Sequence, residues 1–233
     1  MNPMAVYILL SVASVAVSIL AALLRNRGRE KGRLLAKLAA SLLFCGIACL
    51  AACARAAPMN SYAALMLAAL TLGLIGDVLL GLDRLAAENC QNFLFLVGGT
   101  PFFLGHILYI SLLLSYAPLR PGLLLILPLV PLFFLLLQRL KVVRLGKLLV
   151  PLLIYGLVLG GMMLSTLNVA LLGGALGRLM LLPGILFTIS DTSLFLQKFG
   201  KEKLGRALPA LAYSVMLPYY GAQCLFAMSV AYL

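Results

Sequence analysis

The stretch YAALMLAALTLGLIGDVLLGL, residues 62–82, decides the fold class, because it is a continuous apolar run that contains a single carboxylate, Asp77. A helix needs about 20 mainly apolar residues to cross the hydrocarbon core of a bilayer. A carboxylate in such a run costs roughly 2.5–3.5 kcal/mol on insertion scales, so an acid there indicates a functional site. A second acid, Asp191, lies in the apolar run around FTISDTS, residues 187–193.

The composition of the whole chain indicates the same class. The mean hydropathy is +1.14, with 64% hydrophobic and 10% charged residues, which leaves too few polar groups to cover a soluble domain. The apolar runs are continuous, whereas transmembrane β-strands alternate apolar and polar residues. We therefore predict an all-α polytopic membrane protein, a single eight-helix transmembrane domain over residues 1–233. The predicted spans are Met4–Leu24, Leu35–Ala56, Tyr62–Leu82, Phe93–Tyr116, Leu123–Leu137, Leu148–Thr166, Ala175–Leu196 and Ala207–Leu233.

Prolines modify two of these spans. The fifth is short and contains Pro128 and Pro131, and proline removes a helical hydrogen bond, so we expect a bent or tilted segment. The seventh contains Pro183, about two turns before Asp191, and we expect a kink there.

The basic residues are distributed unevenly between the two ends of the predicted helices. Positive residues concentrate in the cytoplasmic loops of membrane proteins. Both termini are therefore expected on the non-cytoplasmic side, in an integral multi-pass protein of a bacterial inner or cell membrane. The net charge of +12 then needs no nucleic-acid partner. The 15 of 18 basic residues on the cytoplasmic side are Arg25, Arg27, Arg29, Lys31, Arg33, Lys37, Arg84, Arg139, Lys141, Arg144, Lys147, Lys198, Lys201, Lys203 and Arg206, and the other three are Arg55, Arg120 and Arg178.

The two halves of the chain share a similar spacing of polar residues. His106 follows Asp77 by 29 residues, and Tyr220 follows Asp191 by 29 residues. Both acids lie in helices that run toward the cytoplasm, and a lysine opens the second and sixth predicted spans. The pattern suggests a 4+4 internal duplication with polar sites at equivalent places.

Asp77 and Asp191 are the candidate catalytic residues. Each lies one to two turns from the cytoplasmic end of its predicted helix, where a cavity open to the inner leaflet could reach it. Two carboxyls that face each other can hold one proton between them and act as acid and base together. The alternative is that a neighbour neutralises each carboxyl, which then only joins helices.

His106, the only histidine, is the third candidate catalytic residue. It either donates a hydrogen bond into the same cavity or fixes one aspartate, and the plain alternative is a hydrogen-bonded residue of a helix interface. A metal held by both aspartates and this histidine is a weaker alternative. A triad of Ser190, His106 and Asp191 is weaker still, because the histidine lies in another helix. We predict no metal and no cofactor.

A further polar set is predicted to bind the substrate. Tyr219, Tyr220 and Gln223 lie on neighbouring faces of the eighth span. A glutamine at mid-membrane depth needs a hydrogen-bond partner. The alternatives are hydrogen bonding between helices for this set and, for the lysine, a side chain that snorkels to the interface. The predicted residues are Lys37, Tyr109, Ser190, Tyr219, Tyr220 and Gln223.

Several short segments together resemble the YhhN-like membrane family, whose members include lysoplasmalogenases. They occur in the family's order and cover the chain from the second to the eighth span. One departure is Leu38, where the family usually has a proline after the lysine. The matching segments are Lys37, LIGDVLL at residues 74–80, FFLGHILY at 102–109, FTISD at 187–191 and YYGAQ at 219–223.

The resemblance implies an eight-span hydrolase that cleaves the vinyl ether bond of a lysoplasmalogen. The products are a fatty aldehyde and a glycerophospho-base, ethanolamine or choline. The family's key acids fall on Asp77 and Asp191. Protonation of the vinyl ether creates an oxocarbenium ion, which needs an acid, an anion and a water molecule, as in glycoside hydrolysis. His106, Tyr109, Tyr220 and Gln223 are then expected to orient water and the glycerol hydroxyl, while Lys37 meets the lipid phosphate.

Two other function classes fit the same residues. A small proton-coupled transporter would also use buried acids and a histidine, and would move a solute without cleaving a bond. A non-catalytic lipid-binding membrane protein would use the acids only for packing. The expected partners in the enzyme interpretation are a lysophospholipid substrate and the bilayer, and the oligomeric state is not predicted.

Overall fold

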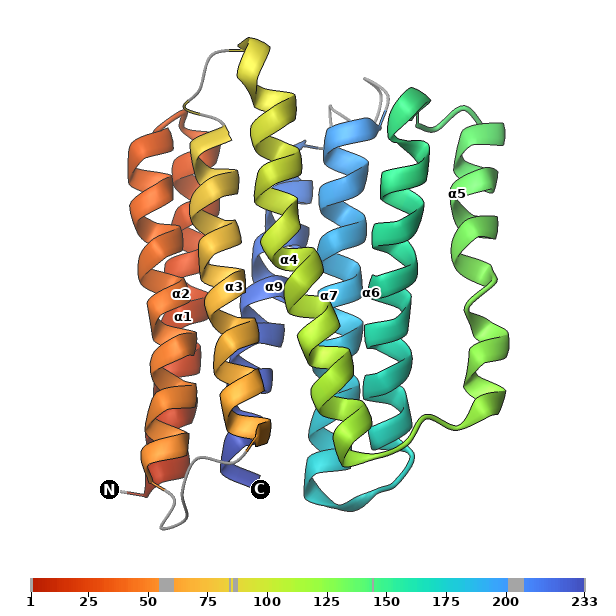
Figure 1. Cartoon of the computed structure of the whole chain (residues 1–233). Helices are drawn as coiled ribbons and strands as arrows, with labels where there is room; N and C mark the ends of the chain where they lie inside the picture. The colour runs from red at the N-terminus through yellow and green to blue at the C-terminus, as the bar shows by residue number, and fades with distance from the viewer. Residues whose placement is uncertain are drawn as a thin grey trace.

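The computed structural model describes residues 2–54, 61–83, 85, 88–143, 145–200 and 208–232. In these ranges the chain forms a bundle of long helices that run alternately up and down (Figure 1). The helices are α1 (Pro3–Asn26), α2 (Glu30–Cys53), α3 (Ser61–Asp83), α4 (Glu88–Tyr116), η1 (Pro121–Ile126), α5 (Leu129–Arg139), η2 (Gly146–Leu148), α6 (Leu149–Ala170), α7 (Gly174–Phe199), α9 (Leu208–Ser229) and η3 (Val230–Tyr232).

The described chain is that of an integral multi-pass membrane protein. Seven of its helical segments are long and apolar enough to cross a membrane, and α9 runs alongside them as an eighth helix (Figure 1). In lipid each backbone N–H and C=O must find its partner within the segment, which a helix achieves and an irregular chain does not. The all-helical class is therefore confirmed.

The predicted span boundaries need corrections. The second helix begins at Glu30, ahead of the predicted Leu35, so Lys37 lies two turns inside α2. The fourth begins at Glu88, ahead of the predicted Phe93. The fifth span, predicted as bent or tilted, is interrupted at residues 127–128, between η1 and α5, because Pro128 has no N–H to continue the helix. Pro183 lies inside a continuous α7.

The two chain termini lie at the same end of the bundle, opposite the connection between α1 and α2 (Figure 1). An even number of crossings requires this arrangement. Six residues in the count of basic residues lie outside the described part of the chain: Arg55, Arg84, Arg144, Lys201, Lys203 and Arg206.

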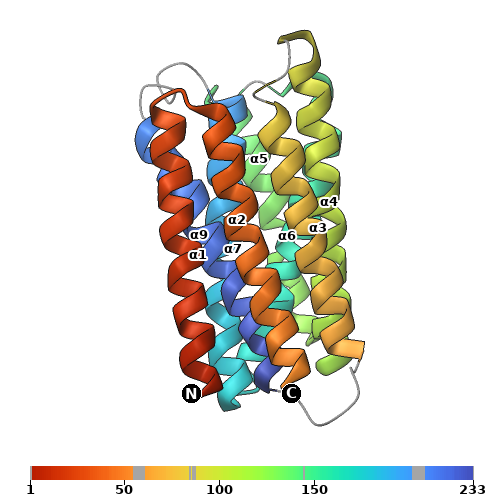
Figure 2. The same cartoon turned by 90° about the vertical axis from the view of Figure 1, so that its left-hand side faces the viewer.

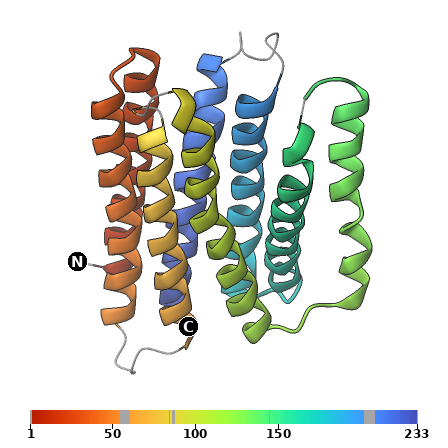
Figure 3. The same cartoon turned by 45° about the horizontal axis from the view of Figure 1, so that its top comes forward.

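The first and fifth helices are placed differently. α1 packs against α2 and α9 (Figure 2), whereas α5 packs mainly against α6 and stands at the margin of the bundle (Figure 3). α9 lies at the centre, against α1, α2 and α7. Its residues Tyr220 and Phe226 are fully buried, so α9 supplies much of the core.

Glycines permit the close helix contacts that position the acids. A Cβ atom on Gly76 would lie 2.5 Å from the Phe102 ring, so this glycine lets α4 approach α3 directly beside Asp77. A Cβ atom on Gly184 would collide with Thr166 of α6. Small residues at such contacts are typical of helix packing in membranes, where backbones must approach closely.

Candidate functional site

Asp77 is held by three side chains from two other helices. Its Oδ1 lies 2.9 Å from the Lys37 ammonium nitrogen on α2. Its Oδ2 accepts hydrogen bonds from the hydroxyls of Ser41 on α2, at 2.7 Å, and Tyr220 on α9, at 3.2 Å. Both oxygens of this carboxylate therefore have partners, and a lysine balances its charge.

The same lysine is bound from several directions. The Lys37 ammonium group also donates to the backbone carbonyl of Asp77, at 3.1 Å. Its own carbonyl accepts from Ser41 and Tyr220, at 2.9 and 3.2 Å. Lys37 and Asp77 are 4% and 2% exposed, so this is a buried ion pair. Removing one partner of such a pair leaves an uncompensated buried charge.

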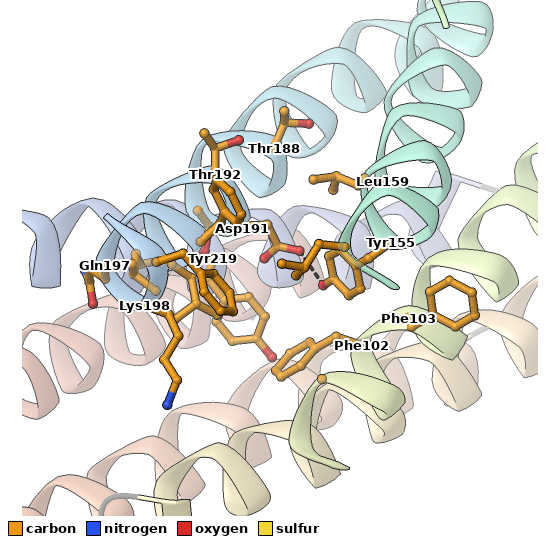
Figure 4. A pocket seen from close by; sticks show the side chains of 18 of the residues that line it. Phe102, Phe103, Tyr155, Leu159, Thr188, Asp191, Thr192, Gln197, Lys198 and Tyr219 are labelled. Atoms are coloured by element: carbon orange, nitrogen blue, oxygen red, sulfur yellow. Dashed lines mark hydrogen bonds between the residues drawn. The ribbon is translucent and has the colours of Figure 1, made fainter. Parts of the chain in front are cut away.

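Asp191 has a different set of partners. Its Oδ2 accepts a hydrogen bond from Tyr155 on α6, at 2.6 Å, and lies 3.1 Å from His106 Nε2 on α4. The Tyr155 hydroxyl is also 3.3 Å from His106 Nε2. Figure 4 shows the Asp191 carboxyl group directed at Tyr155. Among the described residues, no hydrogen bond is made by Asp191 Oδ1, and no lysine or arginine pairs with this carboxyl.

A layer of aromatic and amide groups supports the residues that bond the aspartates. Tyr109 on α4 donates to Gln223 Oε1 at 2.6 Å, and Gln223 Nε2 donates to the Tyr219 hydroxyl at 3.1 Å. The Tyr219 ring packs edge-on against Phe187, which in turn packs against His106. Tyr219 also packs edge-on against Tyr220, so this layer contacts one partner of each aspartate.

A cavity of about 1040 Å³ reaches both aspartates. Ligand pockets in proteins commonly run from about 300 to 1000 Å³, so this one has room for a long ligand. One wall is apolar and comes largely from α4, α5 and α6, with Phe103, Val130 and Phe134 among its residues. The opposite part is polar and includes Lys37, Asp77, Tyr155, Asp191 and Tyr219.

The rim of the cavity at the basic end of the bundle is charged. In the part of the chain that the structure describes, Arg25 of α1, Arg33 of α2 and Lys198 of α7 line it, together with one acid, Glu30. Arg25 donates to Gln197 at 2.9 Å, and Arg33 Nη1 donates to Glu30 at 2.9 Å. A ligand in the cavity would thus meet an apolar wall, two carboxyls and a basic rim.

The structure brings together some predicted site residues in the cavity and places others behind it. The cavity is lined by Asp77, Asp191, Lys37, Ser190 and Tyr219, although the Ser190 hydroxyl donates to the Val215 carbonyl at 3.0 Å. The buried residues outside the lining are His106, Tyr109, Tyr220 and Gln223. These four contact the lining residues or each other, so any role they have is indirect.

Sequence reasoning missed four residues of this site. Ser41 follows Lys37 by four residues and so shares its helix face, which could have identified it. Tyr155 is a hydroxyl in an otherwise apolar segment, but packing was the simpler interpretation. Arg33 and Lys198 were counted only as loop charges, because the helix ends were placed too far inside the membrane.

The acids are paired crosswise between the halves of the chain. Asp77 of α3 bonds Tyr220 of α9, whereas Asp191 of α7 bonds His106 of α4. The two aspartates and the histidine do not form one cluster, and among the described residues no three histidine, cysteine, aspartate or glutamate side chains gather as metal ligands. The alternative metal site of two aspartates and His106 is therefore not assembled.

Comparison with known proteins gives one match. The sequence model of the YhhN family matches residues 32–230, nearly the whole bundle from the start of α2 to the end of α9. The chain therefore belongs to the YhhN family. Searches of curated proteins and of solved structures gave no match.

Proposed function

We propose that this member of the YhhN family is a lysoplasmalogenase-type ether hydrolase, which cleaves the vinyl ether bond of a lysoplasmalogen to a fatty aldehyde and a glycerophospho-base. The observation that carries the proposal is the cavity whose polar part contains two carboxyls in different states of pairing. The chemistry needs such a difference, because one group must donate a proton while another stabilises a cation.

Asp191 is the proton donor in this proposal. Its Oδ2 accepts from Tyr155 and contacts His106, which leaves Oδ1 to carry the proton toward the cavity. No lysine or arginine pairs with it among the described residues, so its carboxyl is not held as the partner of a fixed cation. His106, Tyr155 and the aromatic layer then act as positioning residues.

Asp77 is the fixed anion. Lys37, Ser41 and Tyr220 bond both of its oxygens, so it stays a carboxylate whose negative charge lies next to the cavity. A preorganised charge aimed at the place where opposite charge develops stabilises a transition state without reorganisation. The ion pair with Lys37 keeps this carboxylate from competing for the proton.

The reaction then balances as follows. Asp191 gives its proton to the β-carbon of the vinyl ether, and the electrons of the double bond form the new C–H bond. The oxocarbenium ion is attacked at its α-carbon by water, whose released proton returns to Asp191. The hemiacetal transfers its hydroxyl proton to the glycerol oxygen as the C–O bond breaks. The aldehyde and the glycerophospho-base leave, and the acid is regenerated.

The apolar wall suits the hydrocarbon tail of a single-chain lipid. Residues Val130 and Phe134 of α5 face Gly156 of α6 closely, and all three line the cavity. Because α5 packs mainly against α6, the tail can lie between this margin of the bundle and α4. The polar set of Tyr109, Ser190, Tyr219, Tyr220 and Gln223 serves in this proposal to orient water and the glycerol hydroxyl, directly for Tyr219 and Ser190 and through neighbours for the others.

We also propose that the basic end of the bundle faces the cytoplasm, which places both termini outside, in a bacterial inner or cell membrane. The basic rim of the cavity lies at this end, so the substrate would come from the inner leaflet. Anionic lipid phosphates and basic interface residues attract each other.

An internal duplication is part of the proposal. The bonded pairs Ser41–Asp77 and Tyr155–Asp191 are both separated by 36 residues. Tyr109 and Gln223, which are 114 residues apart, bond each other. Tyr109 and Gln223 are therefore equivalent positions that touch, which places them near the rotation axis that would relate the two halves. The same shift of 114 residues relates Ser41 to Tyr155, Asp77 to Asp191 and His106 to Tyr220.

The deciding experiment is fatty aldehyde release by the purified protein from lysoplasmenylethanolamine, with the ester-linked lysolipid assayed beside it. Aldehyde from the first and no fatty acid from the second is the expected result. If folded protein releases neither aldehyde nor fatty acid, the hydrolase assignment is wrong. The function is then proton-coupled transport, which solute flux in vesicles tests, or lipid binding without turnover.

A further inference from the structure

Arg33 is a buried cation with unused hydrogen-bonding capacity at the rim of the cavity. Its side chain is 6% exposed, and its Nε is buried without a hydrogen-bond partner. Nη1 donates to Glu30 at 2.9 Å, which leaves the edge formed by Nε and Nη2. A buried donor without a partner costs about 1–3 kcal/mol, so an unpaired Nε–H on a residue that lines the cavity points to a missing acceptor.

The chemistry of that acceptor follows from the geometry of the guanidinium group. Its planar edge donates two parallel N–H groups, which match two oxygens of a carboxylate or a phosphate. Among the described residues, the rim around it carries Arg25 and Lys198 as further cations and Glu30 as its one acid. An excess of positive charge favours an anion, and Glu30 remains available to an ammonium group beside that anion.

The position of Arg33 fits the length of the proposed substrate. Arg33 and Lys37 are four residues apart on α2, so Arg33 lies about one helical turn, roughly 5.4 Å, nearer the basic end than the Lys37–Asp77 pair. Five covalent bonds separate the ether oxygen of a lysoplasmalogen from its phosphorus, a comparable span. A lipid whose vinyl ether reaches the aspartates can therefore place its phosphate at the rim.

We propose that Arg33 binds the phosphate group of the ligand through its Nε–Nη2 edge. This inference rests on the proposed function for the identity of the lipid. It replaces Lys37 in the phosphate-binding role predicted from the sequence, because the ammonium group of Lys37 bonds Asp77. It also makes a phosphate-bearing head group a requirement for tight binding.

Binding of two non-hydrolysable lipids to the full-length protein tests the assignment. One is a 1-O-alkyl lysophosphoethanolamine and the other a 1-O-alkylglycerol with the same chain. Arg33→Gln should weaken binding of the first by about tenfold or more, the range of a lost charge-assisted hydrogen bond, with little effect on the second. Arg33→Lys keeps the positive charge but loses the two parallel N–H donors of the guanidinium group, so its affinity for the phospholipid should lie between those of the wild type and Arg33→Gln. Arg27→Gln is the control, because Arg27 is exposed and outside the cavity lining.

The outcomes separate this inference from the proposed function. Equal affinity of wild type and Arg33→Gln for the phospholipid would overturn it, even in an active enzyme. An equal loss of affinity for the phospholipid and the alkylglycerol in Arg33→Gln would also overturn it. So would an equal loss of phospholipid affinity in Arg27→Gln. A selective loss supports it even when no aldehyde is released. Millimolar inorganic phosphate identifies the source of the phosphate: displacement of the lysophospholipid from the wild type indicates a free anion, and no displacement indicates a lipid head group.

Discussion

The Asp77 cluster and the Asp191 cluster place a carboxyl at related positions but hold it differently. Asp77 has an ammonium group and two hydroxyls on its two oxygens. Asp191 has a tyrosine and a histidine on one oxygen, and its other oxygen has no partner among the described residues. The difference teaches that similar sequence contexts can hold one carboxyl in a buried ion pair and leave one oxygen of the other carboxyl without a partner among the described residues.

The helices next to the two clusters also differ in how closely they pack against the rest of the bundle. α1 packs against the central helix α9, whereas α5 packs mainly against α6, and residues of α4 and α5 line the cavity. If α1 and α5 are equivalent helices of a duplication, the half whose first helix stands at the margin of the bundle is the half that would hold the ligand tail in the proposed function.

The largest effect is expected for Asp191→Asn. Loss of the proton donor should lower aldehyde release by about 10²–10⁴-fold, the usual contribution of general acid catalysis. Stability should change little, because asparagine still accepts from Tyr155 and no lysine loses its partner. Initial rates and thermal unfolding in detergent measure both. Thr188→Val, on the same wall of the cavity, is the control and should keep most of the activity; an active Asp191→Asn enzyme would refute the assignment.

Asp77→Asn should lose stability as well as activity. The Lys37 ammonium group would be left buried with no counter-charge, which costs about 3–5 kcal/mol. The double variant Asp77→Asn with Lys37→Met should recover most of the stability but not the activity. Unfolding midpoints of the three proteins check this, and a single variant as stable as the wild type would mean that the ion pair does not hold the helices.

Tyr155→Phe and Tyr220→Phe compare one tyrosine hydroxyl from each cluster, each of which bonds an aspartate. Tyr155 gives Asp191 its shortest hydrogen bond, at 2.6 Å, and its loss should lower kcat by about tenfold. Tyr220→Phe should cost less, because Ser41 still donates to the same oxygen of Asp77 at 2.7 Å. Steady-state rates at saturating lipid test the order, and the reverse order would exchange the roles of the two aspartates.

The smallest effect is expected for Ser41→Ala. Its hydroxyl donates to Asp77 Oδ2, which keeps the bond from Tyr220, so the free energy of unfolding should fall by about 1 kcal/mol. Ser165→Ala is the matched control, because that buried hydroxyl donates to the Gly161 carbonyl of its own helix and lies outside the lining of the cavity. Equal losses in the two variants would indicate that the bond from Ser41 to Asp77 contributes no more than a hydroxyl bond to a carbonyl of the same helix.

The sequence predicted the helical membrane class and most of the long helices, and it located the irregular span, which was predicted as bent or tilted and is interrupted between η1 and α5. It also identified both acids, because a carboxyl in a long apolar run is costly wherever the helix lies. The boundaries of α2 and α4 were predicted too late along the chain: charged residues such as Glu30 and Arg33 continue the helix beyond the hydrocarbon region, and the hydropathy pattern does not register that continuation.

Only the tertiary structure decided which residue pairs with which acid. Lipid tails are as apolar as leucine, so the face of a membrane helix that packs against protein looks like the face that meets lipid. The sequence therefore could not tell that Asp77 turns toward Lys37 and Tyr220, or that Asp191 turns toward His106 and Tyr155. The sequence by itself determined which membrane helices contain a carboxyl group. The packing of α2, α4, α6 and α9 decided which side chains bond each carboxyl.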